Sequence, residues 1–285
     1  MGKGTVLGPL QPVTLTLDQV LAGRVPRLPP LDRTAQGYLV RSLPASIHAA
    51  LVAASGGMIG IVRARRARRH VDLGLGFDAW QATIEQGARE TIRACEARIA
   101  EVSGGALAIQ RCDTPDAVTA LHDGAARIDL RSHRARLGTG VPDDQAFLRQ
   151  TAGLAASGAL RAWLLAVAGE PAAYLYGEMV NGVVVRRYIG SDPAFAELRP
   201  EMVQQWHALR ALFADGGLRH FDFHDGDSES ARCFATGAVP CADLALLRAS
   251  LADRVSAMVA SGVGQVGAVA RQIGRSRRAT TGPAA

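Results

Sequence analysis

The sequence predicts an α+β fold in which mixed, mostly antiparallel sheets are flanked by helices. Three strand-like segments, 161–168, 171–179 and 183–189, follow one another through the tight-turn sequences Gly169-Glu170 and Asn181-Gly182. Strands joined in this way form an antiparallel meander. A helix, a strand, a short helix and a last strand follow, so we expect the helices to cover one sheet.

The composition is that of an ordinary globular protein, with 48% apolar and 20% charged residues in 285. A chain of this length can bury a core without disulfides, and its four cysteines lack the spacing of a metal or redox site. We therefore expect reduced thiols, no metal and a cytoplasmic location. The net charge of +6 suits phosphate-bearing partners, but no motif predicts specific binding of nucleic acid.

The first half of the chain begins with residues 1–34, which are rich in proline and glycine and predict a flexible arm. Short strand signals follow at 37–40, 58–65 and 70–73. Asp78 is a suitable cap for a long amphipathic helix, which ends at Gly104-Gly105.

Another strand and two helices complete the first half. The strand-like segment is 106–110, and Thr114-Pro115 is a typical helix start for a helix that runs to about Arg136. The loop 138–144 separates it from a helix over 145–156.

After the meander, a helix begins near Pro200 and ends at Gly216-Gly217. The strand 219–224, the short helix 228–234 and the strand 243–248 follow. The step from strand to helix to strand around Pro200 is a place where a sheet can splay, and a helix N-terminus there attracts phosphate.

The order of these elements resembles the GNAT acyltransferase fold. Three segments carry the resemblance most clearly: WLLAVAGEPAAYLYG at 163–177, RYIGSDPAFAELRP at 187–200 and FDFHDGDSESARCFATG at 221–237. The sequence is similar to the BioF-like or CelD-like acetyltransferase branch, whose relatives include the FemAB ligases.

The resemblance covers about residues 35–250 and implies two GNAT-like halves. These are 35–157 and 158–250, with a candidate acyl-CoA cleft against the second half. The arm 1–34 precedes them, and a C-terminal helix with a basic tail, 251–285, follows. That tail could contact an anionic membrane, so a peripheral location at the inner membrane is expected beside the cytoplasmic one.

The resemblance implies transfer of an acyl group from acyl-CoA, such as acetyl-CoA, to an amine. The acceptor would be a small molecule or a cell-envelope or polysaccharide precursor. The alternative is a GNAT-fold binding or scaffold protein in polysaccharide assembly that has lost catalysis. Arg199-Pro200-Glu201 stands where the family has Ser-Pro-Gly, and Ser230-Ala231 stands where it has His-Lys. An aminoacyl-tRNA donor, as in FemAB relatives, is a third possibility.

The resemblance places the cofactor beside Tyr188, Ile189, Gly190 and Arg199. Arg199 could pair with the phosphates of CoA, as could Arg186 and Arg187, which precede it on the same segment. Surface arginines in contact with solvent are the alternative interpretation.

Two residues are candidates for catalysis. Asp222 lies between Phe221 and Phe223, so if the phenylalanines face the core, the carboxylate faces the cleft and could take a proton from the amine. The alternative is a carboxylate bonded to backbone at a strand end. Tyr176 could protonate the leaving thiolate, or it could pack across the sheet.

The candidates for substrate binding surround the same strand end. His224 continues the face of Asp222, and the acidic loop after it contains Asp225 and Asp227. Glu178 and Arg232 complete the predicted acceptor site. A plain turn is the alternative interpretation of this loop, because Asp and Gly are common turn residues.

Overall fold

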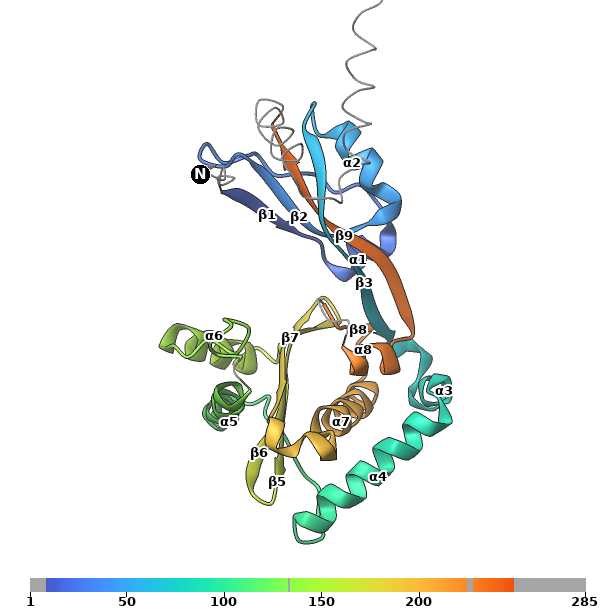
Figure 1. Ribbon diagram of the computed structural model, residues 1–285, viewed down its shortest axis with the longest axis vertical. Helices are drawn as coiled ribbons and strands as arrows, with labels where there is room; N and C mark the ends of the chain where they lie inside the picture. Colours follow the sequence, from blue (N-terminus) through green and yellow to red (C-terminus); the bar gives the residue numbers. More distant parts are fainter. Residues whose placement is uncertain (1–8, 133, 225–227, 249–285) are drawn as a thin grey trace, which may run out of the picture. The chain divides into compact units, whose positions relative to one another are not determined.

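The computed structural model describes residues 9–132, 134–224 and 228–248. Within them, nine strands are hydrogen-bonded into a mixed sheet in the order β1-β2-β9-β3-β8-β7-β6-β5-β4, with helices beside it (Figure 1). The predicted α+β class is therefore confirmed. No helix in these residues is long and apolar enough to cross a membrane. The expected C-terminal helix and basic tail, 251–285, lie outside the described residues.

The chain divides into two compact units. The first contains residues 1–67 and 239–285, and the second contains residues 68–238. The expected boundary between residues 157 and 158 falls inside the second unit.

The first unit is built on three neighbouring strands. β1 (Leu10–Thr14) runs parallel to β2 (Gly37–Pro44), and β2 is antiparallel to β9 (Gly237–Leu247). Helices α1 (Leu17–Ala22) and α2 (His48–Ala54) supply side chains to a core with these strands. That core contains Leu15, Val20, Tyr38, Val40, Leu43, Leu51, Cys241, Leu244 and Leu246.

The described part of the expected N-terminal arm is folded into this unit. Thr16 and Gln19 form a reciprocal capping box at the start of α1. Leu15, Leu17 and Val20 are almost fully buried. Burial of these apolar side chains outweighs the turn signals from proline and glycine that suggested a flexible arm.

The second unit contains the predicted meander. β4 (Ala108–Arg111), β5 (Leu160–Val167), β6 (Glu170–Val180) and β7 (Val183–Ser191) pair antiparallel in sequence order. The connections Ala168-Gly169 and Asn181-Gly182 both have positive φ at each residue, which is the geometry of two-residue hairpins. β8 (His220–Asp222) then lies parallel to β7 and antiparallel to β3 (Ile59–Asp72).

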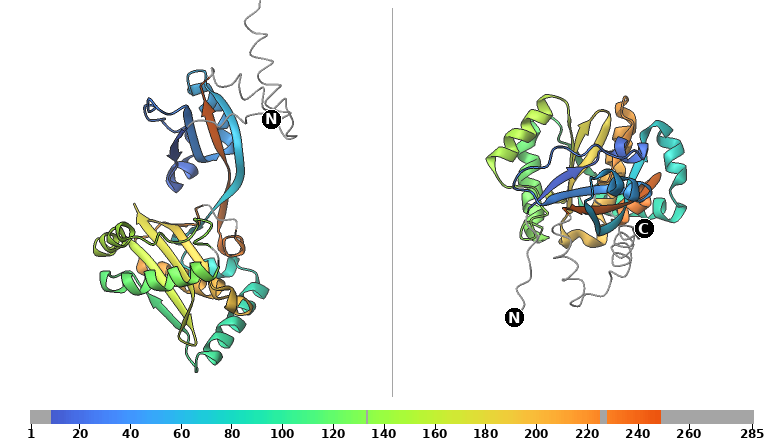
Figure 2. Two further views of the ribbon diagram at one scale, coloured as in Figure 1. Left: turned by 60° about the vertical axis from the view of Figure 1, so that its left-hand side comes forward. Right: turned by 90° about the horizontal axis from the view of Figure 1, so that it is seen from above.

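Helices cover both faces of the meander, as Figures 1 and 2 show. α5 (Val118–Arg131) and α6 (Gln145–Ala156) pack on one face. α7 (Pro200–Asp215) packs on the other face, with Trp206 and Leu209 in a core that includes strand residues. α8 (Glu229–Phe234) follows β8 and contributes to this core.

The long helix expected from Asp78 onward is two helices. α3 (Phe77–Thr83) and α4 (Gln86–Val102) are separated by Ile84, which is extended. The break buries Ile84 in the core and leaves Trp80 buried, where its indole N–H donates to the carbonyl of Phe234 at 2.9 Å. Tertiary burial thus overrides a continuous helical pattern.

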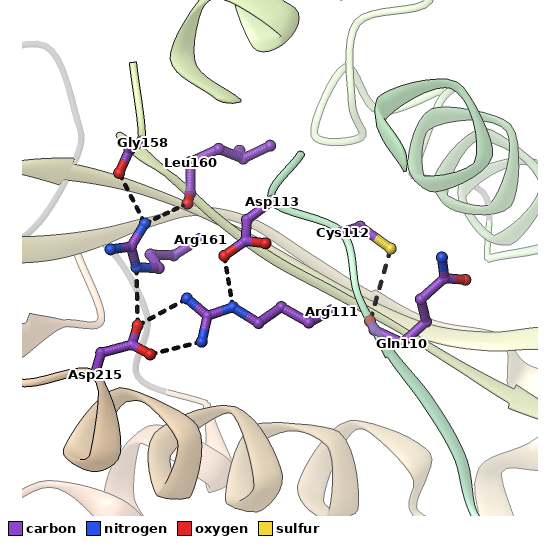
Figure 3. A network of polar contacts seen from close by, with 8 residues as sticks. All are labelled: Gln110, Arg111, Cys112, Asp113, Gly158, Leu160, Arg161 and Asp215. Carbon is purple, nitrogen blue, oxygen red and sulfur yellow. Dashed lines mark hydrogen bonds and ion pairs between the residues drawn. The ribbon is translucent and has the colours of Figure 1, made fainter. Parts of the chain in front are cut away.

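A polar network at Asp215 holds the end of α7 to β4 and β5 (Figure 3). Arg111 donates to both carboxylate oxygens, at 2.6 and 2.8 Å, and Arg161 Nε donates at 3.1 Å. The hydrogen bonds that Arg111 donates to Asp215 raise the pKa of Arg111 further above its ordinary value. Beside this network, Cys112 is fully buried, and burial raises its pKa to about 11, as befits an inert thiol.

Candidate active site

Strand β7 loses its β8 partner part of the way along its length. β8 pairs only with Val183–Val185, whereas β6 stays paired with β7 as far as Ser191. β8 ends at Asp222, and His224 then turns the chain with a φ of 56°. Among the described residues, β7 beyond Val185 therefore has one edge without a strand partner, at the step where the sequence predicts a splay.

A bulge lies in the same part of β7. Gly177 opposes Arg186 and Tyr176 opposes Tyr188, so Arg187 is an extra residue on β7. A bulge bends a strand and redirects its side chains. Here Arg186 is buried on the side of α7, Arg187 is exposed, and Tyr188 packs on the side of α6.

Asp222 is sealed in the interior, so the prediction that it faces a cleft as a base is wrong. Asp222 is 0% exposed, and its Oδ2 and Oδ1 accept from Nη2 and Nε of Arg68, at 2.6 and 3.2 Å. Oδ1 also accepts from the backbone N–H of His224 at 2.9 Å. Alternation placed Asp222 opposite Phe221 and Phe223 correctly, but Arg68 of β3 covers that face.

Tyr176 is also closed off, which does not support its expected role as a proton donor. Its ring packs against Phe147 and Tyr188, and its hydroxyl lies 3.2 Å from Thr151 Oγ1. Burial raises the pKa of Tyr176, so the hydroxyl keeps its proton. Its neighbour Tyr174 is fully buried and donates to Asp129 at 2.8 Å. These contacts fit the alternative of packing across the sheet.

The side chains at the predicted cofactor positions of β7 fix the strand. Tyr188 packs against the aromatic cluster around Tyr176, and Ile189 packs on the opposite core. Gly190 is required by close packing, because a Cβ there would lie 2.5 Å from the ring of Tyr174. Gly190 thus offers a ligand only its backbone, whereas Tyr188 and Ile189 are partly exposed.

A pocket of about 470 Å³ brings together two predicted ligand-binding residues, Arg199 and Arg232. Arg199 has a left-handed backbone (φ 47°) and directly precedes the start of α7. Arg232 lies on α8, and α4 supplies the third wall. The lining residues are Thr83, Glu85, Ala88, Thr91, Ile92, Cys95, Arg199, Met202, Glu229, Arg232, Cys233 and Ala235.

The charges of this pocket are partly balanced. Glu229 forms an ion pair with Arg199, and the hydrogen bond raises the pKa of Arg199 and lowers that of Glu229. Arg232 is exposed on the same helix as Glu229. The pocket thus presents two guanidinium groups, of which that of Arg199 is paired with Glu229, and a second carboxylate, that of Glu85.

The other predicted substrate-binding residues are not gathered at this pocket. Glu178 forms an ion pair with Arg187, with Nη2 and Oε2 2.8 Å apart. His224 is half-buried at the end of β8. Asp225 and Asp227 lie outside the described residues. In the part of the chain that the structure describes, no group of three His, Cys, Asp or Glu side chains could hold a metal ion.

The most unusual polar residue of the site is Arg186, which the sequence suggests only as a phosphate ligand. It is 6% exposed, and its guanidinium lies 5.1 Å from the ring centroid of Phe223. Its Nη1 donates to Gln205 Oε1 at 3.3 Å. Burial lowers the pKa of Arg186 to about 10. The bulge separates Arg186 from Arg187, and no sequence signal distinguishes the two.

Gln205 and Arg68 are buried polar residues of this region that sequence reasoning did not single out. Gln205 lies on α7 one turn after Glu201, whose Oε1 accepts from Ser230 Oγ at 3.0 Å. A buried glutamine on an otherwise apolar helix face is a signal that could have been noticed. Arg68 could not be separated from its neighbours in an arginine-rich strand.

Solved structures similar to this chain share its fold at low sequence identity. A protein of unknown function from Bacteroides thetaiotaomicron has a TM-score of 0.50 and 13% identity, over 74% of this chain and 70% of that one. The C-terminal domain of a putative lysylphosphatidylglycerol synthetase from Agrobacterium fabrum has a TM-score of 0.50 and 12% identity, over 78% of this chain and 70% of that one. FemX has a TM-score of 0.50 and 10% identity, over 78% of this chain and 74% of that one. These likenesses support the fold.

The sequence comparisons address the family directly. A search of curated proteins finds no match. The family model of the acetyltransferase (GNAT) domain matches residues 86–230, which is about half of the chain and includes β4 to β8. The bulged β7, the following helix α7 and the short parallel strand β8 all lie within this match. The chain therefore belongs to the GNAT acetyltransferase domain family.

Proposed function

We propose that this protein is an N-acyltransferase that moves an acyl group from acyl-CoA to an amine on a small molecule or a glycan precursor. Membership of the GNAT family supports acyl transfer in general. The observation that supports a CoA donor is the edge of β7 beyond Val185, which has no strand partner among the described residues.

The free edge of β7 suits the pantetheine arm of CoA, because that arm carries amide groups. An extended chain adds to a free strand edge by exchanging hydrogen bonds with the backbone. The backbone groups of Tyr188, Ile189 and Gly190 are assigned this role. A backbone N–H at the same edge would stabilise negative charge on the carbonyl oxygen during transfer.

The pocket at the start of α7 suits the phosphates. Arg199 and Arg232 supply the positive charge, while Glu229 holds Arg199 in place. Glu201 brings a negative charge to the same helix end, which opposes phosphate there. Because Asp222 is sealed by Arg68, the proton of the acceptor amine is assigned to solvent.

Release of free thiol from acetyl-CoA in the presence of an amine panel tests this function. The double variant Arg199→Ala/Arg232→Ala should raise KM for acetyl-CoA by about tenfold or more, because two phosphate ligands are lost. Arg98→Ala, an exposed arginine of α4 outside the pocket, is the matched control and should behave as the wild type. No thiol release with any amine would count against the proposal.

A GNAT-fold binding protein without catalysis is the second candidate. Two observations favour it: Asp222 is unavailable as a base, and Glu229 already pairs with Arg199. Calorimetry with CoA separates the two functions. A Kd of about micromolar order favours the enzyme, and absence of heat at about millimolar CoA favours the binding protein.

A further inference from the structure

A cluster of buried hydrogen-bond donors lies where β7 passes its last β8 partner. Arg186 directly follows Val185, the last residue of β7 that is paired with β8. Within the described residues, its one hydrogen bond is the bond to Gln205 Oε1. Gln205 is 0% exposed, and its Nε2 has no hydrogen-bond partner there. Gln205 Nε2 is therefore a buried donor that lacks an acceptor, in the same amide group that accepts from Arg186.

The neighbouring carboxylates do not fill this shortage. The charges of Glu201 and Asp222 both favour the Arg186 cation, yet burial outweighs them and lowers its pKa. Asp222 is bonded to Arg68 and to the backbone of His224. Glu201 accepts from Ser230.

A buried donor without an acceptor is costly to the folded protein. The penalty is roughly 1–3 kcal/mol for a neutral group and larger for a charged one. Native proteins contain few such groups, so each one calls for an explanation. A ligand that supplies acceptor oxygens would remove the penalty. The guanidinium lies over the ring of Phe223, with Cζ 5.1 Å from the ring centroid. A guanidinium fork can bind a planar carboxylate at two atoms.

We propose that Arg186 and Gln205 bind a carboxylate group of the substrate, carried by either the acceptor amine or the acyl chain. The inference rests on the proposed function, because it places this carboxylate beside the free edge of β7. A carboxylate suits the cluster better than a phosphate. The charges of Glu201 and Asp222 would repel a dianion more strongly than a single charge.

Thermal unfolding of the full chain with small probes tests binding without chemistry. Glycine is compared with glycinamide as an acceptor-like pair, and succinamate, which carries one carboxylate, with succinamide as an acyl-like pair. A ligand that binds only the folded state raises the melting temperature. The wild type should be stabilised by glycine or by succinamate and not by the matching amide, and the responding pair identifies the source. Equal melting temperatures in all four probes would overturn the proposal.

Variants of the cluster show whether Arg186 carries the effect. Arg186→Met should lose the carboxylate-dependent shift and keep or exceed the ligand-free stability of the wild type. Arg210→Met, an exposed arginine on α7, is the matched control and should keep the shift. If Arg186→Met fails to fold, Gln205→Leu should weaken the shift in its place. An unchanged shift in Arg186→Met or Gln205→Leu would contradict the assignment.

Gln205→Glu is the sharpest variant, because it places a carboxylate beside Arg186 within the protein itself. It should raise the melting temperature without ligand and abolish the response to glycine or succinamate. A rise in stability with an unchanged response would show a merely structural role.

Activity provides an independent readout. With acetyl-CoA, amino acids should exceed their amides in kcat/KM by about tenfold or more if the acceptor carries the carboxylate. With an amine that has no carboxylate, the kcat/KM for succinyl-CoA should exceed that for acetyl-CoA if the acyl chain carries the carboxylate. Carboxylate-dependent stabilisation without thiol release would refute the proposed function and leave this inference standing. Thiol release without either preference would overturn this inference and leave the proposed function standing.

Discussion

At the scale of single residues, the partner of a charged side chain decides its role in this protein. Asp222 and Arg68 bond each other in the interior, where Asp222→Ala removes a counter-charge of the buried guanidinium. Asp222→Ala is therefore expected to lower the free energy of unfolding by about 3–5 kcal/mol. Urea denaturation measures this loss.

The double variant Arg68→Met/Asp222→Leu is the control for this prediction. It removes both charges, so it should recover most of the lost stability. A folded, fully stable Asp222→Ala protein that had lost acyl transfer would instead return Asp222 to a catalytic role.

Gly190 tests the packing of β7 on Tyr174. A methyl group at this position would meet the tyrosine ring at 2.5 Å, so Gly190→Ala should cost about 1–3 kcal/mol of stability. Gly153 is an exposed glycine inside α6 with open space around its Cα. Gly153→Ala should stabilise the protein by roughly 0.5–1 kcal/mol, as measured by the same denaturation experiment. Equal effects of the two variants would contradict the close approach at Gly190.

At the scale of elements, the bulge and the short β8 strand create the site together. The bulge at Arg187 places its two neighbours on opposite faces, with Arg186 towards α7 and Tyr188 towards α6. The end of β8 at Asp222 leaves the following part of β7 without a partner on that side. A regular strand would have placed Arg186 and Tyr188 on the same face, because side chains alternate along a strand.

Helices α4, α7 and α8 form the pocket, and Cys233 of α8 can report on its occupancy. Burial raises the pKa of Cys233, so alkylation should accelerate about tenfold per pH unit as long as the pH stays below that pKa. Acetyl-CoA, which has no free thiol to consume the reagent, should slow this labelling, because Cys233 lines the pocket. Cys112 is fully buried outside the pocket and should stay unlabelled throughout. Mass spectrometry of both peptides checks this, and labelling of Cys233 at one rate with and without acetyl-CoA would contradict it.

At the scale of the whole molecule, two units with separate cores make up the chain. The three tryptophans, Trp80, Trp163 and Trp206, all lie in the second unit. Urea unfolding followed by tryptophan fluorescence therefore reports on the second unit, whereas far-UV circular dichroism reports on both. We expect the two transitions not to coincide, because each unit has its own apolar core.

A probe in the first unit provides the control for this experiment. Tyr38→Trp places a fluorophore in the core of that unit. Its transition should differ from that of the native tryptophans. Coincidence of all three signals would show that the two units unfold as one.

Much of the second unit could be predicted because its signals are local. Asn181-Gly182 supplies the positive φ values of a hairpin, and Pro200 and Gly216 mark the two ends of α7. The first unit was harder to predict, because β1, α1 and α2 are short and gain their stability from tertiary burial. The break at Ile84 has the same cause.

By itself, the sequence determined the α+β class, the strand order of the meander and the resemblance to GNAT acyltransferases. Turn chemistry and the period of apolar residues act over a few positions, so they can be read along the chain. Only the tertiary structure decided that Arg68 covers Asp222 from 154 residues away and that Arg186, not Arg187, faces inward. Alternation predicts which face a side chain takes, but what covers that face is supplied by residues far away in sequence.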